Sequence, residues 1–259
     1  MEPAISPLLF AVLLFGGMLI LLEIGRRLSI RRRSKESEGE RGSLGTIEGA
    51  MFALFGLVVA FTFSGAASRF NEKRILIAEE ANAIETAYLR LQLLSPEARL
   101  ELQELFRQYV DSRLETYRKL PNMEAAETEM ARSKKLQEEI WTKAVVATRL
   151  PNSHPDAGKV LLPALNSMID ITTIRKMALQ THPPNIIYAL LFILGLICSL
   201  LAGYRMASGQ HRSWLHILSF ATITVIIVYV VIDVEYPRSG LIRLQAFDQL
   251  LVEVREGMK

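Results

Sequence analysis

The chain has 259 residues, of which 50% are hydrophobic and 22% charged, and its formal net charge at pH 7 is +3. The charges are unevenly distributed: residues 3–22, 49–68, 177–204 and 213–232 contain no Asp, Glu, Lys or Arg. A helix of ~20 apolar residues crosses the ~30 Å hydrocarbon core of a bilayer. The pattern predicts four membrane-spanning helices, which excludes a soluble globular protein, and the modest net charge gives no sign of nucleic-acid binding.

The first window predicts a retained transmembrane helix over residues 1–22. A secretory signal peptide needs a basic start and a small-residue cleavage site, whereas this chain starts Met1-Glu2 and an arginine cluster follows the apolar stretch. The next segment, 23–48, is a basic linker whose cations suit anionic lipid headgroups better than nucleic acid. These cations are Arg26, Arg27, Arg31, Arg32, Arg33, Lys35 and Arg41.

The second span, 49–68, is predicted to continue as one helix into a soluble domain over 69–182, because no proline occurs between Leu8 and Leu94. In that continuation apolar residues recur at spacings of 7, 4, 3, 4 and 3, which is the seam of a helix packed against other helices. The seam is Phe70, Ile77, Ala81, Ile84, Tyr88 and Leu91, with Arg74 in the missing place and Asn82 beside it as a candidate for specifying register.

Prolines mark the turns of the soluble domain. Ser95-Pro96-Glu97 is typical of a helix start, so further helices are predicted over 96–120, 123–150 and 156–180. Pro163, early in the last of these, is a candidate break.

The third and fourth spans are predicted at 183–204 and 213–232, and the tail, 233–259, mixes apolar and polar residues. We expect this tail to pack back on the soluble bundle. The predicted fold class is therefore all-α: four transmembrane helices with a helical-bundle soluble domain that is continuous with spans 2 and 3.

One face of the second span is a candidate pore lining. Its residues follow helical spacing, and rings of Leu and Phe in an oligomer form a hydrophobic constriction. The face consists of Ala53, Leu57, Phe61, Ser64 and Ser68. The alternative is a plain packing face, since small residues on the same side let membrane helices approach closely. From the residues alone the packing interpretation is favoured.

Acidic residues in two places are candidates for a cation site or for structural ion pairs: Glu79, Glu80 and Glu85 on the long helix, and Asp233 and Glu235 after the last span. Solvated ion pairs are the favoured interpretation. The four histidines do not have metal-ligand spacing, and no nucleotide-binding or catalytic motif is present. We therefore predict no enzyme, no cofactor and no metal.

Two stretches make the chain similar to a bacterial bestrophin-like family of unestablished function. They are Glu79-Glu80-Ala-Asn82-Ala-Ile84-x-x-Ala87-Tyr88-Leu89-Arg90 and the tail motif Asp233-x-Glu235-x-Pro237-x-x-Gly240-Leu-Ile-Arg243. The resemblance covers residues 48–247. Over about 25 residues, Phe61 followed by Arg69-Phe70-x-Glu72-x-Arg74 also resembles the second helix of bestrophins, which are anion channels.

The resemblance implies a homo-oligomeric channel in a bacterial inner (cytoplasmic) membrane, with Ala53, Leu57 and Phe61 ringing the pore. Arg69, Lys73 and Arg74 would then attract anions. Its partners would be the lipid bilayer, further copies of itself and small anions. The alternative is a non-conducting membrane protein whose helical domain binds a partner or senses the envelope. Loop arginines and lysines favour the helical domain outside the cytoplasm, whereas the resemblance favours it inside.

Overall fold

The computed structural model describes residues 6–32, 38–119, 122–206, 214–237, 241–242 and 245–258, and the regular structure of these residues is entirely helical. The chain divides into two compact units. The membrane unit holds Glu2–Arg69 and His182–Tyr236, and the helical unit holds Phe70–Thr181 and Pro237–Lys259. The predicted all-α class is confirmed.

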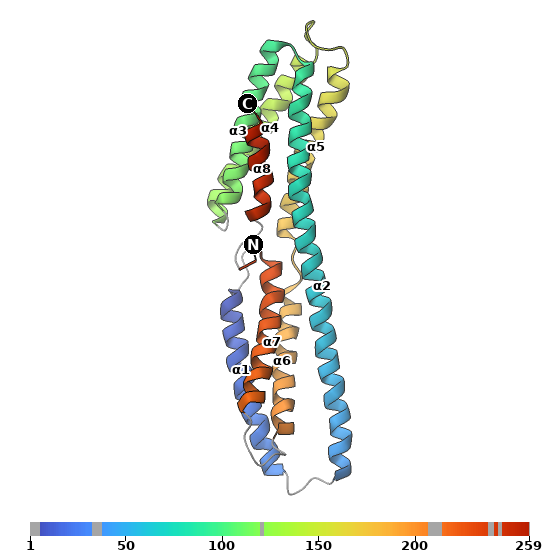
Figure 1. The fold of residues 1–259 in the computed structure, drawn as a ribbon, viewed down its shortest axis with the longest axis vertical. Helices are drawn as coiled ribbons and strands as arrows, with labels where there is room; N and C mark the ends of the chain where they lie inside the picture. The colour runs from blue at the N-terminus through green and yellow to red at the C-terminus, as the bar shows by residue number, and fades with distance from the viewer. Residues whose placement is uncertain are drawn as a thin grey trace. The chain divides into compact units, whose positions relative to one another are not determined.

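The membrane unit is built from α1 (Pro7–Arg32), the first part of α2 (Glu38–Arg90), α6 (Asn185–Met206) and α7 (Trp214–Glu235) (Figure 1). Each of the four predicted spans lies in a helix that is long and apolar enough to cross a membrane. Residues 23–32 and 38–48 of the predicted linker are helical, because α1 and α2 extend into it.

α1 and α6 approach so closely that glycine is required at their crossing. A Cβ atom added to Gly25 would lie 2.0 Å from the Leu200 carbonyl oxygen, and one added to Gly203 would lie 2.0 Å from the Leu22 carbonyl oxygen. Small residues at such crossings let two membrane helices pack backbone to backbone. α7 packs on α1, and Leu14, Met18 and other apolar side chains fill the space between these helices.

The helical unit combines the remainder of α2 with η1 (Leu91–Leu93), α3 (Pro96–Arg118), α4 (Met123–Ala147), α5 (Ala157–Gln180) and α8 (Gln245–Gly257) (Figure 1). Ser95 caps α3 as its sequence predicts, and Asn122 caps α4: their side chains accept hydrogen bonds from the amides of Ala98 and Ala125. Most of the predicted α2 seam is buried: Ala81, Ile84 and Leu91 belong to the core of the helical unit, and Ile77 is also buried.

Three local features extend or correct the sequence predictions. Pro163 does not break α5, because the loss of one backbone hydrogen bond is offset by the burial of Leu161 and Leu165 on either side of it. Asn82 is exposed rather than inserted beside the seam. The tail packs on the bundle as expected: α8 contacts α3, and Leu251 is part of the core.

Candidate functional site

The apolar part of α2 is the least covered of the four candidate spans. In its most apolar window 11% of the residues are buried, against 28% in the first span, 33% in the segment that ends with α6, and 44% in α7. The covered side carries Phe55, which packs with Leu191, Leu194 and Cys198 of α6. The remaining surface of this helix is free to meet lipid, other copies of the chain or water.

All five predicted pore residues lie on this uncovered side of α2: Ala53, Leu57, Phe61, Ser64 and Ser68 are exposed. Phe61 is 69% exposed and Leu57 52% exposed, so neither packs into the rest of the membrane unit. Gly56 and Ala60 are exposed on the same helix. The face therefore combines two bulky apolar residues with small and hydroxyl side chains, which suits both a pore lining and a close helix contact between copies.

Arg69 ends this part of α2 in a bidentate ion pair with Glu235 of α7. Its Nε lies 3.0 and 2.9 Å from the two carboxylate oxygens, and its Nη2 lies 2.7 Å from Oε2. The Nδ1 atom of His182 lies 3.1 Å from Oε1 of the same carboxylate. The Glu235 side chain is 1% exposed, that of His182 14% and that of Arg69 26%. We call Arg69, His182 and Glu235 the junction triad.

The junction triad lies on the three connections that the chain makes between its two units. The units divide after Arg69, after Thr181 and after Tyr236. Arg69 and His182 are the membrane-unit residues directly at the first two divisions, and Glu235 lies one residue before the membrane-unit residue at the third. The His182 ring also stacks on Tyr236, with centroids 4.5 Å apart and planes at 22°. One carboxylate therefore ties together the membrane-side ends of all three connections.

The other two predicted anion-attracting residues follow Arg69 along α2, in the helical unit. Lys73 is 5% exposed, whereas Arg74 is exposed. The structure does not gather the three cations on one open surface, because Arg69 is paired and the Lys73 side chain is buried.

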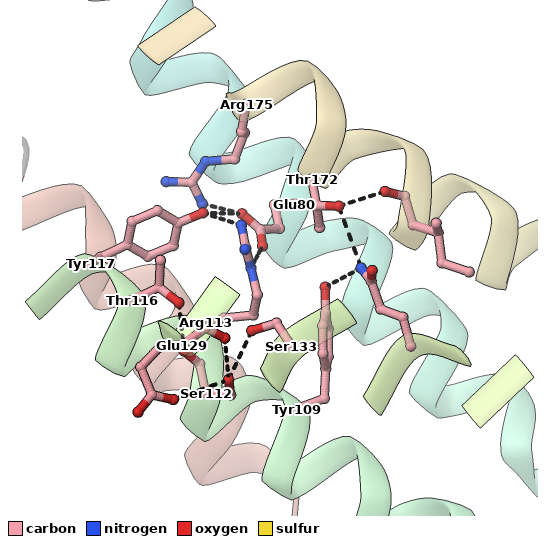
Figure 2. A network of polar contacts seen from close by, with 12 residues as sticks. Glu80, Tyr109, Ser112, Arg113, Thr116, Tyr117, Glu129, Ser133, Thr172 and Arg175 are labelled. Carbon is pink, nitrogen blue, oxygen red and sulfur yellow. Dashed lines mark hydrogen bonds and ion pairs between the residues drawn. The ribbon is translucent and has the colours of Figure 1, made fainter. Parts of the chain in front are cut away.

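A second charged cluster lies inside the helical unit, around Glu80 of α2 (Figure 2). Glu80 Oε1 accepts from Nε of Arg113 on α3 at 2.6 Å, and Oε2 accepts from Arg175 on α5 and from the Tyr117 hydroxyl at 3.1 Å. The Arg175 guanidinium lies over the Tyr117 ring, 4.1 Å from its centroid. Asp248 of α8 lies 3.9 Å from Arg175 Nη2. We call Glu80, Arg113, Tyr117 and Arg175 the bundle cluster.

Charge balance explains how the bundle cluster is tolerated in a core. Glu80 is 0% exposed, and Arg113 and Arg175 are each 4% exposed. Burial alone would raise the pKa of Glu80, but the charges and hydrogen bonds of Arg113 and Arg175 lower it to about 2. Asp248 of α8 adds a second carboxylate beside Arg175.

Hydroxyl and amide side chains extend this polar layer across α3, α4 and α5 (Figure 2). The Gln137 amide donates to the Tyr109 hydroxyl at 3.1 Å, and the Ser112 and Ser133 hydroxyls lie 2.8 Å apart. Buried polar groups that find partners fix one arrangement of a bundle, because a mismatched register leaves them unpaired. The layer therefore specifies how these helices align.

The remaining predicted acidic residues are dispersed. Glu79 and Glu85 are exposed and form no ion pair with any described residue, whereas Glu80 faces the core. Asp233 is 1% exposed and accepts from the Tyr229 hydroxyl at 3.3 Å. Within the described parts of the chain, no three His, Cys, Asp or Glu side chains are grouped in a way that could hold a metal ion.

Sequence reasoning missed the partners of both clusters. His182, Arg113, Arg175 and Tyr117 had no predicted role, because each meets its carboxylate from a distant part of the chain. A signal for Glu80 did exist: Lys73, Ile77, Glu80 and Ile84 are spaced by four, three and four residues, which places Glu80 on the edge of the buried seam.

Comparison with known proteins adds a family and a set of related folds. The chain matches the Bestrophin-like domain over residues 12–246. No curated protein matches it. Two solved variants of a bacterial bestrophin homologue from Klebsiella pneumoniae are similar in structure. One has a TM-score of 0.65 at 13% identity, covering 94% of this chain and 98% of that one. The other has a TM-score of 0.63 at 14% identity, covering 94% and 97%.

Proposed function

The chain belongs to the Bestrophin-like family, and from this premise we propose that it assembles into an oligomeric membrane channel whose pore is lined by α2. The protein itself is a multi-pass membrane protein of a channel family. We propose three further features: several copies assemble, α2 lines the pore, and anions are the conducted ions. The proposal describes a channel rather than an enzyme.

One observation carries this proposal: the α2 face with Leu57 and Phe61 is uncovered in the single chain. A pore requires these residues to face a symmetry axis, whereas a partner-binding protein that does not conduct would pack them against its other spans. Within the described part of the membrane unit, Leu57 and Phe61 are exposed and α2 packs on α6 through Phe55, which supports the first arrangement. In a ring of copies, the exposed Leu and Phe would make the constriction, and the exposed glycine and alanine would allow neighbouring α2 helices to approach.

We propose anions as the conducted ions on the strength of the family resemblance. Of the three predicted anion-attracting side chains, Arg69 is paired with Glu235, Lys73 is buried and Arg74 is exposed. The proposed location is the bacterial inner membrane. A reporter fused to the C-terminus, tested for accessibility in intact cells, distinguishes the two orientations of the helical unit.

The proposal is tested with purified protein reconstituted into planar bilayers. We expect salt currents, and we expect Phe61→Ala to increase them several-fold, because it removes the largest side chain of the proposed constriction. Leu215→Ala is the matched control: its side chain is also exposed in a span, but on α7. Protein that crosslinks as an oligomer and stays silent in both forms contradicts the channel, and a clean monomer contradicts the pore geometry.

A further inference from the structure

A groove lies between α2 and α8 within the helical unit, and each of its walls is one face of a helix. Its volume is about 330 Å³. The described residues of the α2 wall recur at helical spacing, as do those of the α8 wall. From α2 they are Ala78, Ala81, Asn82, Glu85, Tyr88 and Leu89. From α8 they are Leu250, Glu253, Val254, Gly257 and Met258. The two helices thus share a space that neither fills.

Small side chains keep this groove open. A Cβ atom added to Gly257 would meet no other atom within 4 Å, and Ala78 and Ala81 line the α2 wall. Protein interiors are otherwise packed to the density of organic crystals. A volume of about 330 Å³ falls in the range of small-molecule sites, ~300–1,000 Å³.

The Tyr88 hydroxyl is the observation that points to a ligand. Its oxygen is buried, and it has no hydrogen-bond partner among the described residues. The ring is held by an edge-on contact with Phe106, with centroids 5.8 Å apart. A buried hydroxyl without a partner costs free energy, and such groups are rare in native structures. A molecule bound in the groove would supply the missing partner.

The charges of the groove are negative. Glu85 and Glu253 stand on opposite walls, both are exposed, and neither forms an ion pair with a described residue. The described lining contains no Lys, Arg or His. Arg255 interacts electrostatically with Tyr88, but it lies outside this lining and pairs with Asp111 at 2.7 Å. The groove therefore suits a cation.

The rest of the lining decides the kind of cation. Calcium takes six to eight oxygen ligands, whereas Leu250, Val254 and Met258 make much of this lining apolar. A protein partner fits less well, because the described lining comprises 11 residues and each side of a stable protein interface contributes ~20–30. An organic cation with an apolar body matches both parts of the groove.

We propose that the groove between α2 and α8 binds a small primary ammonium compound with an apolar body. A primary ammonium group has three donors, and the groove offers three acceptors in Glu85, Glu253 and the Tyr88 hydroxyl oxygen. The apolar body would lie against Leu250 and Val254. This inference does not depend on the proposed channel, because it concerns binding to the helical unit.

The test is calorimetric titration of the full chain in detergent, at neutral pH, with 2-phenylethylamine as the probe. We expect a dissociation constant below about 1 mM, after subtraction of a titration into protein-free micelles. The uncharged alcohol 2-phenylethanol, which has the same apolar body, should not bind. Glu253→Gln should weaken binding of the amine about tenfold, because it removes a charged hydrogen-bond acceptor. Glu256→Gln is the matched control: it removes an exposed carboxylate of α8 outside the lining and should bind as the parent does.

Two further variants separate binding from folding. Gly257→Leu fills open space and should abolish binding without lowering the melting temperature. Tyr88→Phe should weaken binding, yet the unliganded variant should melt no lower than the parent, because the lost hydroxyl had no partner. A lower melting temperature for unliganded Tyr88→Phe would contradict that reasoning.

The proposal is wrong if the parent protein shows no heat beyond the micelle blank, or if the alcohol binds as tightly as the amine. Equal affinities for the parent, Glu253→Gln and Gly257→Leu would place the amine elsewhere on the protein. A parent protein that binds no amine but crosslinks as an oligomer, together with a monomeric Gly257→Leu variant, would assign the groove to a second copy of the chain instead.

Discussion

Replacing Glu80 by glutamine should destabilise the helical unit far more than the same substitution at any other glutamate of α2. The substitution keeps the side-chain volume and removes the charge that Arg113 and Arg175 share in the core. Removing one partner of a buried ion pair costs about 3–5 kcal/mol, because it leaves an uncompensated buried charge. For a unit of this size, that corresponds to a fall in melting temperature of roughly 10–18 °C.

The neighbouring residue gives a matched control. Glu79→Gln makes the same chemical change one position away, on an exposed side chain without an ion pair among the described residues, and should stay within about 0.5 kcal/mol of the parent. Thermal unfolding of the detergent-solubilised full chain, followed by circular dichroism, compares the two variants. Equal melting temperatures for both variants would refute the claim that Glu80 is a buried counter-ion of two arginines.

Other contacts, and the pH dependence of Glu80, lead to three further predictions. Gly203→Ala should lower the melting temperature of the membrane unit by an amount equivalent to about 3 kcal/mol, because its Cβ would meet the Leu22 carbonyl, whereas Gly16→Ala, with open space around it, should be neutral. Asp111→Asn breaks a half-exposed ion pair with Arg255, so it should lower the free energy of unfolding by about 0.5 kcal/mol, and by less in high salt. Because the pKa of Glu80 is lowered to about 2, its stabilising contribution should be complete above pH ~4.5 and should disappear as the pH falls to 2; unfolding curves that are flat over that range would contradict this.

The fold could be predicted from the sequence because its determinants are local. The charge-free windows predict the four spans, and the absence of proline between Leu8 and Leu94 predicts the continuous α2. Ser95 marks a helix start through a hydrogen bond within one turn. Each of these signals depends on residues no more than a few positions apart, so no knowledge of tertiary packing was needed.

The clusters could not be predicted, because they depend on which helices meet. Glu79, Glu80 and Glu85 look equivalent in composition, yet Glu80 alone turns into the core. Its partners lie 33 and 95 positions away in the chain. A periodicity argument identifies the buried side of α2 but does not say which residues of α3 and α5 will face it.

The two clusters differ in how open they are to water, and that difference argues for different roles. In the helical unit, the side chains of Glu80, Arg113 and Arg175 are at most 5% exposed. Because a buried charge is costly without its partner, this cluster stabilises one arrangement of the helices that it joins. In the membrane unit, Arg69 is 26% exposed and pairs with Glu235, which is 1% exposed. All three members of the junction triad lie within two residues of a division between the units, so its contacts fix where the chain leaves the membrane unit.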